Sequence, residues 1–208
     1  MADKQGRHAR RYLLCLPVLV ASILSAAGCS PGGPSGGDGP LGTLMLAGKP
    51  DFVVVSLGVT PGQPADGEAF VVNSANAPVT ITAVSAIDVP GAAAAHLADV
   101  AIQAGTHPVG AQRGWPPQIE VQLKPAIGAR LPHGQSGIIY GVTGQVIGRD
   151  YAIAGVRISY TFGGRPYTAI AWGGDMACVV ASLDSSTAIC SAFYNKVNAA
   201  IEHMSGLT

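Results

Sequence analysis

The segment GTHPVGAQRGWPP, residues 105–117, holds three side chains of different chemistry within a few positions of one another. His107 offers an imidazole, Arg113 a permanent cation and Trp115 a large aromatic ring. Long irregular connections between strands often carry binding residues. The loop therefore predicts one of two roles for Trp115. It is an aromatic anchor for a peptide or glycan, or it folds back over the open end of the core, which is the interpretation we favour.

The remaining histidines do not form a metal-binding pattern. No two of them stand at an HxH or HxxxH spacing, which metal ligands on one strand or helix would need. After the N-terminal segment they are His96, His107, His133 and His203. We expect separate, solvent-exposed histidines, no metal site and no cofactor.

Patterns for covalent or acid–base catalysis are also missing. No nucleophile elbow is predicted between a strand and a helix, and no serine is followed by a lysine three residues on. Ser182 and Asp184 lie close together, but in a turn sequence that is typical of a helix cap. The acidic residues are isolated from one another, so we expect a protein that is not an enzyme.

Residues 1–28 have the composition of an export signal. Four cations precede the uncharged stretch 12–28, which is short for a spanning helix, contains Pro17 and ends on small residues. The alternative interpretation, that residues 12–28 form a transmembrane anchor, is less favoured. The pair Arg10 and Arg11 is partly similar to a twin-arginine signal, so the export route stays open.

Ala26-Ala27-Gly28-Cys29 resembles the lipobox of bacterial lipoproteins. The resemblance implies cleavage before Cys29, a lipid on its thiol, and a chain anchored on the extracytoplasmic face of the cell membrane. An ordinary signal peptide that leaves Cys29 free is the alternative.

Charge supports anchoring by lipid. The whole chain has 12 basic and 12 acidic residues, and no surplus of cations with which to bind nucleic acid. Removal of residues 1–28 leaves eight basic and eleven acidic residues, a net charge of −3. A weakly acidic domain has little electrostatic attraction to anionic headgroups, so we expect the membrane to be contacted through the lipid on Cys29.

Two further cysteines remain, Cys178 and Cys190. In an oxidising compartment such a pair is expected to form a disulfide. The first is predicted at the end of a strand and the second in the first turns of a helix, so the bond would join helix to sheet. A redox or metal role is the alternative, although the spacing matches no CxxC motif.

The chain after Cys29 divides into three parts. Residues 29–50 are rich in glycine and proline and predict a tether, with an edge strand possible at 44–46. Residues 51–182 alternate short β-branched runs with turn residues, and residues 183–208 have a helical period. Strands are predicted at 52–59, 68–73, 79–87, 97–103, 119–123 and 138–147, the third with Val79, Ile81, Ala83, Ser85 and Ile87 on one face.

The last hairpin and the helix are the most specific predictions. Gly163-Gly164 suits a two-residue turn that pairs Tyr160 with Tyr167 and Ile158 with Ala169. In the C-terminal segment one apolar stripe is followed by Gly206, where a helix-capping glycine belongs. The stripe consists of Ile189, Phe193, Val197, Ala200, Ile201 and Met204. We expect this helix to cover the sandwich, with a docking surface for a partner as the alternative.

The order of strands and turns suggests a known architecture. Residues 70–73 and 78–81 resemble the early strands of bacterial immunoglobulin-like domains, and residues 131–135 resemble the turn before a middle strand. The resemblance implies a mainly β fold, an antiparallel immunoglobulin-like β-sandwich with one C-terminal amphipathic α-helix. It implies no particular function.

Two functions remain under consideration. The first is a membrane-anchored, non-catalytic binding or structural module at the cell envelope, with an envelope protein or glycan as partner. The alternative is a solute- or metal-binding accessory lipoprotein of a membrane complex. A carrier should have a pocket with convergent polar groups, whereas an interaction module should have an exposed apolar patch.

Overall fold

The part of the chain described by the computed structural model comprises residues 39–43, 45–46, 49–50, 55–104, 112–117, 122–181 and 186–206. These residues form two five-stranded sheets, a two-stranded pair and a helix. The predicted signal peptide, Cys29 and most of the predicted tether lie outside them, as does His107.

The first sheet has the order β1–β5–β10–β7–β8, and its neighbouring strands are all antiparallel. Its strands are β1 (Leu41–Thr43), β5 (Ala65–Asn73), β10 (Gly134–Gly144), β7 (Ala95–Ala104) and β8 (Lys124–Pro125). Strand β1 lies within the stretch predicted to be tether. It belongs to the folded domain, because Leu41 is 2% exposed and its backbone N–H donates to the Tyr160 hydroxyl at 3.2 Å.

The second sheet has the order β4–β12–β11–β6–β9. Its strands are β4 (Val55–Val59), β12 (Arg165–Val179), β11 (Tyr151–Phe162), β6 (Val79–Asp88) and β9 (Arg130–Leu131). The prediction of a wholly antiparallel fold is wrong here, since β4 runs parallel to β12. These strands lie far apart in the chain, so no tight hairpin dictates their direction. The short strands β2 (Met45–Leu46) and β3 (Lys49–Pro50) pair with each other.

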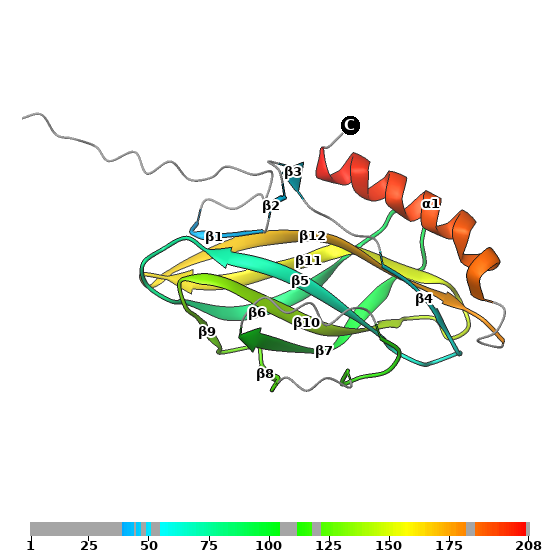
Figure 1. Ribbon diagram of the computed structural model, residues 1–208, viewed down its shortest axis with the longest axis horizontal. Helices are drawn as coiled ribbons and strands as arrows, with labels where there is room; N and C mark the ends of the chain where they lie inside the picture. Colours follow the sequence, from blue (N-terminus) through cyan, green and yellow to red (C-terminus); the bar gives the residue numbers. More distant parts are fainter. Residues whose placement is uncertain are drawn as a thin grey trace, which may run out of the picture.

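The two sheets share one hydrophobic core, and Figure 1 shows them as two layers. The predicted hairpin is confirmed: Tyr160 pairs with Tyr167 and Ile158 with Ala169. Its turn residues Gly163 and Gly164 have φ angles of 58° and 75°, which glycine adopts without steric cost. The inward side of β11 is fully buried at Val156, Ile158 and Tyr160, every second residue of the strand, as the period of a β-strand requires.

The predicted face of β6 is correct only for its first residues. Val79 and Ile81 are fully buried, but the pairing with β11 shifts between Ser159 and Tyr160, so that Thr82 has no direct partner. This bulge reverses the faces, and Val84 and Ala86 contact the core instead of Ala83 and Ser85. The strand predicted at 138–147 is β10, which begins at Gly134 and ends at Gly144. It ends before residue 147 because residues 145–149 form a turn.

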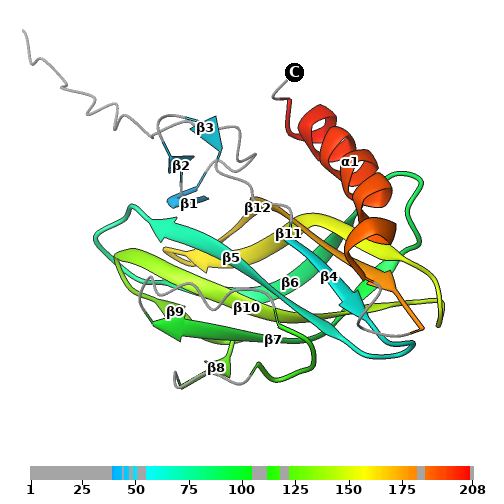
Figure 2. The same ribbon diagram turned by 45° about the vertical axis from the view of Figure 1, so that its right-hand side comes forward.

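Helix α1 (Ser186–Ser205) lies on the outer face of the second sheet, away from β7 and β8 in both views (Figures 1 and 2). Its predicted stripe is confirmed where it is described: Val197 and Ile201 are fully buried, with Phe193, Ala200 and Met204 packed around them. Gly206 has a φ of 70°, as a capping glycine should. The Cys178–Cys190 disulfide joins the helix to β12.

Candidate functional site

A short segment, residues 124–131, links the edges of the two sheets. It contains β8 of the first sheet, a turn, and β9 of the second. The backbone N–H of Ala126 donates to the carbonyl of Val100 at 3.1 Å, and that of Gly128 donates to the carbonyl of Ile81 at 2.9 Å. Since Val100 and Ile81 belong to different sheets, this bridging segment is fixed at both sides.

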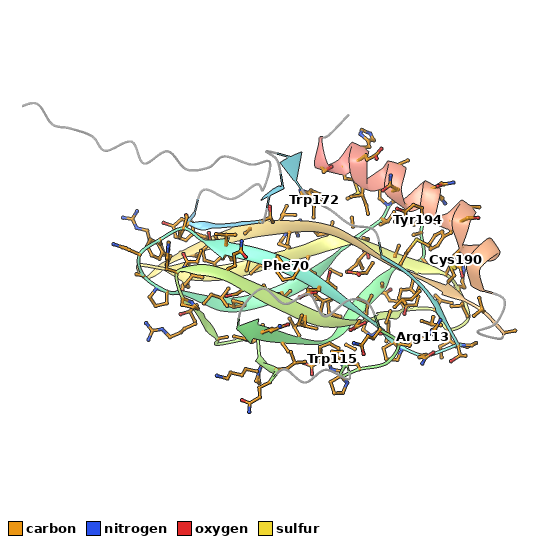
Figure 3. The ribbon with its side chains drawn as sticks, in the orientation of Figure 1. Phe70, Arg113, Trp115, Trp172, Cys190 and Tyr194 are labelled. Atoms are coloured by element: carbon orange, nitrogen blue, oxygen red, sulfur yellow. A yellow bond between two sulfur atoms is a disulfide. The ribbon has the colours of Figure 1, made fainter. Side chains whose placement is uncertain are left out.

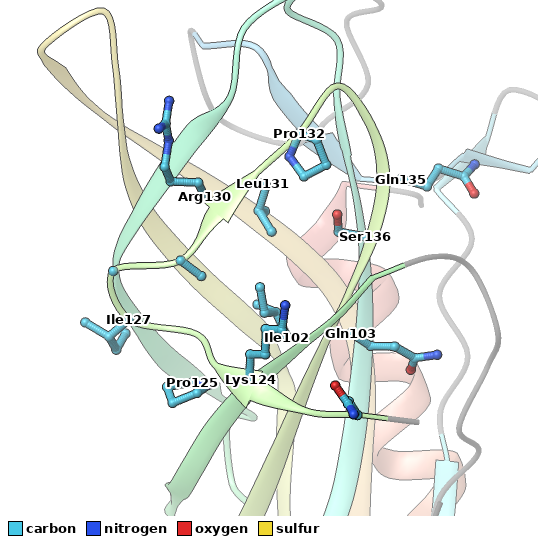
Figure 4. Close-up of a pocket in the computed structure, with 13 residues that line it drawn as sticks. Ile102, Gln103, Lys124, Pro125, Ile127, Arg130, Leu131, Pro132, Gln135 and Ser136 are labelled. Carbon is cyan, nitrogen blue, oxygen red and sulfur yellow. The ribbon is translucent and has the colours of Figure 1, made fainter. Parts of the chain in front are cut away.

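A cavity of about 520 Å³ lies beside the bridging segment (Figure 4). It is bounded by the end of β7, the bridging segment and the start of β10. Its lining residues are Ile102, Gln103, Gln122, Lys124, Pro125, Ile127, Gly128, Ala129, Arg130, Leu131, Pro132, Gln135 and Ser136. The volume falls within the range of small-molecule sites in proteins.

The lining combines an apolar wall with cations. Leu131 is 1% exposed and lies opposite Ile102, which also packs against the core. Lys124 and Arg130 are the charged side chains among the lining residues that the structure describes. In Figure 4 the Lys124 side chain lies among the lining residues, whereas the Arg130 guanidinium points away from them. The cavity therefore favours a ligand with an apolar part and an anionic or hydrogen-bond-accepting part.

A smaller hollow of about 250 Å³ lies at the opposite end of β5, between the β4–β5 turn and the β10–β11 loop. Val146 and Ile147 border it and are 49% and 78% exposed. Most of its apolar area is thus in an exposed loop tip rather than in a formed wall, and we regard the larger cavity as the better candidate.

An acidic group lies buried between the sheets. The hydroxyl of Tyr140 donates to Oδ2 of Asp175 at 2.5 Å, and both side chains are buried. The pKa of Asp175 is raised to about 7, mainly by burial. The hydrogen bond from Tyr140 acts to lower this pKa, whereas the charges of Asp66 and Glu68 act to raise it. Burial, followed by the Asp175 charge, raises the pKa of Tyr140 well above its ordinary value.

Asp66 lies on the other face of the first sheet. Its Oδ1 accepts a hydrogen bond from the backbone N–H of Gln112, and its Oδ2 is buried with no hydrogen-bond partner among the described residues. Burial raises the pKa of this carboxyl, while the hydrogen bond from Gln112 lowers it. These acids do not line either cavity, so we assign them to the stability of the fold.

The loop predicted as a binding site is attached to strands of both sheets where it is described. The Arg113 side chain donates to the carbonyl of Gly58 at 2.6 Å, and the Trp115 indole donates to Asp99 Oδ2 at 3.1 Å. The Trp115 ring lies against Gly141, where a Cβ would be 2.9 Å from it. Figure 3 shows Arg113 and Trp115 on the side away from Trp172 and Tyr194. His107 is outside the described residues, so its place beside them stays a prediction.

The described histidines are held separately. His96 contacts the Thr143 hydroxyl at 2.9 Å, His133 contacts the carbonyl of Ala75 at 2.9 Å, and His203 lies in the last turn of α1. Within the described ranges no three His, Cys, Asp or Glu side chains are grouped so as to hold a metal ion. Nor does any described helix have the length and apolar character needed to cross a bilayer.

The cavity was not predictable from the sequence, because its walls come from three separate segments. A local signal was nevertheless present: residues 122–135 alternate Lys124 and Arg130 with prolines and apolar residues, between predicted strands. No family model, curated protein or solved structure matches the chain.

Proposed function

We propose that this chain is an exported lipoprotein, anchored through Cys29, that serves as a non-catalytic binding module at the cell envelope and takes its ligand in the cavity beside residues 124–131. The observation that carries the proposal is the described lining of that cavity, which is apolar on one side and whose charged side chains are the cations Lys124 and Arg130. Ligand sites in proteins typically combine an apolar wall with a few polar groups that fix orientation.

The scaffold suits such a role. We propose that the domain is related to immunoglobulin-like sandwiches, a relation supported by its two face-to-face sheets and by the turn that leads from Leu131 into the central strand β10. Sandwiches of this kind carry binding residues in the loops that connect their strands, which are free to vary. The bridging segment is such a connection, and it leads through the turn after Leu131 into β10.

Binding of a solute on behalf of a membrane complex remains the alternative. The cavity supports a solute better than a metal, because its polar groups are amides, a hydroxyl and cations rather than metal ligands. Under the interpretation of Trp115 as an aromatic anchor, the ligand is instead an envelope protein or glycan.

Two measurements test the proposal. Mass spectrometry of the mature N-terminal peptide should find a lipid on Cys29, and Cys29→Ala should release the chain from the membrane fraction. Native mass spectrometry of protein taken gently from cell membranes should then find a bound small molecule. The additional mass of the bound molecule should be absent from the Ala129→Phe variant, in which the new side chain fills the cavity. It should still be present in the Val146→Phe variant, in which only the smaller hollow is changed. Retention of the same mass by Ala129→Phe would exclude the cavity as the site.

A further inference from the structure

We propose that the cavity binds an anionic amphiphile from the membrane, with its phosphate or carboxylate beside Lys124 and its hydrocarbon chain along Ile102 and Ile127. This inference rests on the proposed function and names the class of ligand. It is carried by the charge of the cavity, the character of its rim and its position relative to the anchor.

The charge of the cavity selects against cations. Lys124 and Arg130 are the charged side chains among the lining residues that the structure describes, although the chain after Cys29 is acidic overall. A single cation near a membrane surface contributes about 1 kcal/mol of attraction to an anionic lipid, which is about fivefold in affinity. Gln122 and Gln135 supply further hydrogen-bonding groups for a headgroup.

The rim has the character of a membrane-contacting loop. Residues 124–130 read KPAIGAR, so that an apolar tip lies between two cations. Ile127 at this tip is 55% exposed. Aliphatic tips inserted among acyl chains, with flanking Lys and Arg at headgroup level, are a common arrangement at bilayer surfaces. A lipid chain entering the cavity beside Ile127 would remain in contact with apolar atoms.

The anchored end of the domain lies beside the cavity. Leu41 of β1 pairs with Asn73 of β5, and Asn73 pairs with Gly134, the neighbour of the lining residue Gln135. Leu41 is therefore two strand spacings, roughly 10 Å, from the start of β10. The Asn73 side chain also donates to the carbonyl of Leu131 at 3.1 Å, which ties β5 to the bridging segment.

This position limits how far the cavity can be from the bilayer. Leu41 is the twelfth residue after Cys29, and even a fully extended chain of that length spans at most about 40 Å. The smaller hollow lies at the far end of β5, a further nine residues or roughly 30 Å along the strand. Of the two hollows, the one beside Lys124 is thus the one next to the strand that follows the tether.

The test uses the mature lipoprotein reconstituted into vesicles. One set contains phosphatidylglycerol with a photoreactive group on its acyl chain, and a second contains phosphatidylcholine with the same group. After irradiation, the labelled peptides are located by mass spectrometry. We expect the phosphatidylglycerol probe to label peptides containing Ile102 and Ile127. Lys124→Gln should reduce this labelling about fivefold, and Arg130→Gln should reduce it less, because its guanidinium points away from the lining residues.

The controls separate this inference from the proposed function. Arg149→Gln removes a cation at the opposite end of the domain and should leave the labelling unchanged, whereas Ala129→Phe should abolish it. Equal cavity labelling by both lipids would overturn the selection for anions and leave a binding module in place. If inorganic phosphate alone prevented labelling of the cavity by the phosphatidylglycerol probe, the ligand would be a free anion and not a lipid. If palmitate prevented it, the cavity would also bind amphiphiles with a carboxylate headgroup. Labelling confined to the loop with Val146 and Ile147, together with a native mass spectrum that shows no bound molecule, would overturn both the proposed binding site and the proposed class of ligand.

Discussion

The hydroxyl of Tyr140 on β10 and Oδ2 of Asp175 on β12 lie 2.5 Å apart and join the two sheets inside their common core. The contact is possible because Gly67 of β5 has no side chain. A Cβ at that position would be 2.3 Å from Asp175 Oδ2 and 2.4 Å from the Tyr140 ring. A buried carboxyl with one good donor is stable when protonated and costly when ionised.

The stability of the protein should fall as pH rises from about 4 to about 7. In the folded state the pKa of Asp175 is raised to about 7, against 3.8 ordinarily, so in this window the folded chain binds a proton that the unfolded chain has lost. The free energy of unfolding therefore decreases with pH and levels off above pH 7, a change of at most about 4 kcal/mol. Asp175→Asn keeps an acceptor for Tyr140 and should flatten most of this slope in urea unfolding measured from pH 4.5 to 8.

Some pH dependence of the free energy of unfolding should remain in Asp175→Asn, because burial also raises the pKa of Asp66. Asp88→Asn, at an exposed carboxyl on β6, is the matched control and should leave the full slope. A pH dependence that is the same in Asp175→Asn as in the parent protein would show that Asp175 is ionised throughout.

Replacement of Gly67 by alanine should be strongly destabilising. The two side chains that a Cβ would meet belong to separate strands, β10 and β12, and neither is the free end of a flexible chain. Overpacking of this kind costs about 1–3 kcal/mol, and loss of the Tyr140–Asp175 bond would add to it. Gly173→Ala is the control, since a Cβ there meets nothing within 4 Å. Equal midpoints of urea unfolding for both variants would contradict this account.

The hairpin and the helix were predictable because local signals determine them. Gly163-Gly164 set the register of Tyr160 with Tyr167, and the apolar stripe of α1 identified the buried positions Val197 and Ile201. In each case the period and the turn residue lie within one continuous stretch of chain, so no knowledge of distant partners was needed.

The bulge in β6, the parallel pairing of β4 and the cavity depend on distant partners. Thr82 is bypassed because of how β6 aligns with β11, and β4 runs parallel to a strand more than a hundred residues later. Asp175 was identified only as an isolated acid, since its proximity to Tyr140 results from the contact of two sheets. Lys124 was passed over for the same reason, because it acquires a role only beside Ile102 and Leu131.

The disulfide should stabilise the domain by constraining its C-terminal part. It closes a loop with a sequence separation of 12 residues, which corresponds to about 3 kcal/mol in the chain-entropy model. We expect a reductant to lower the thermal midpoint of the parent protein and to have no effect on Cys178→Ala/Cys190→Ala. Helical circular dichroism should show whether α1 melts first. An unchanged midpoint after verified reduction would mean that helix packing alone holds α1 on β12.

Trp115 is the residue whose role separates the two original interpretations of the loop. Its ring rests on Gly141 and its indole N–H is bonded to Asp99, contacts expected of a side chain that covers the sheet. Trp115→Phe should lose that hydrogen bond at a cost of about 1 kcal/mol, and Trp115→Ala should cost more because contact area is lost as well. Gly141→Ala should displace the indole and increase its quenching by acrylamide, measured with Trp172→Phe in the background so that one tryptophan reports.

The anchor interpretation predicts the reverse order of effects. If Trp115 binds an envelope glycan or peptide, Trp115→Ala should abolish retention on purified cell-wall material and change the free energy of unfolding by less than about 0.5 kcal/mol, as surface substitutions usually do. Asp99→Asn provides the decisive comparison, because it weakens the hold on the indole while leaving the ring present. Under the covering role it should destabilise the domain much as Trp115→Phe does, whereas under the anchor role it should leave both stability and retention intact.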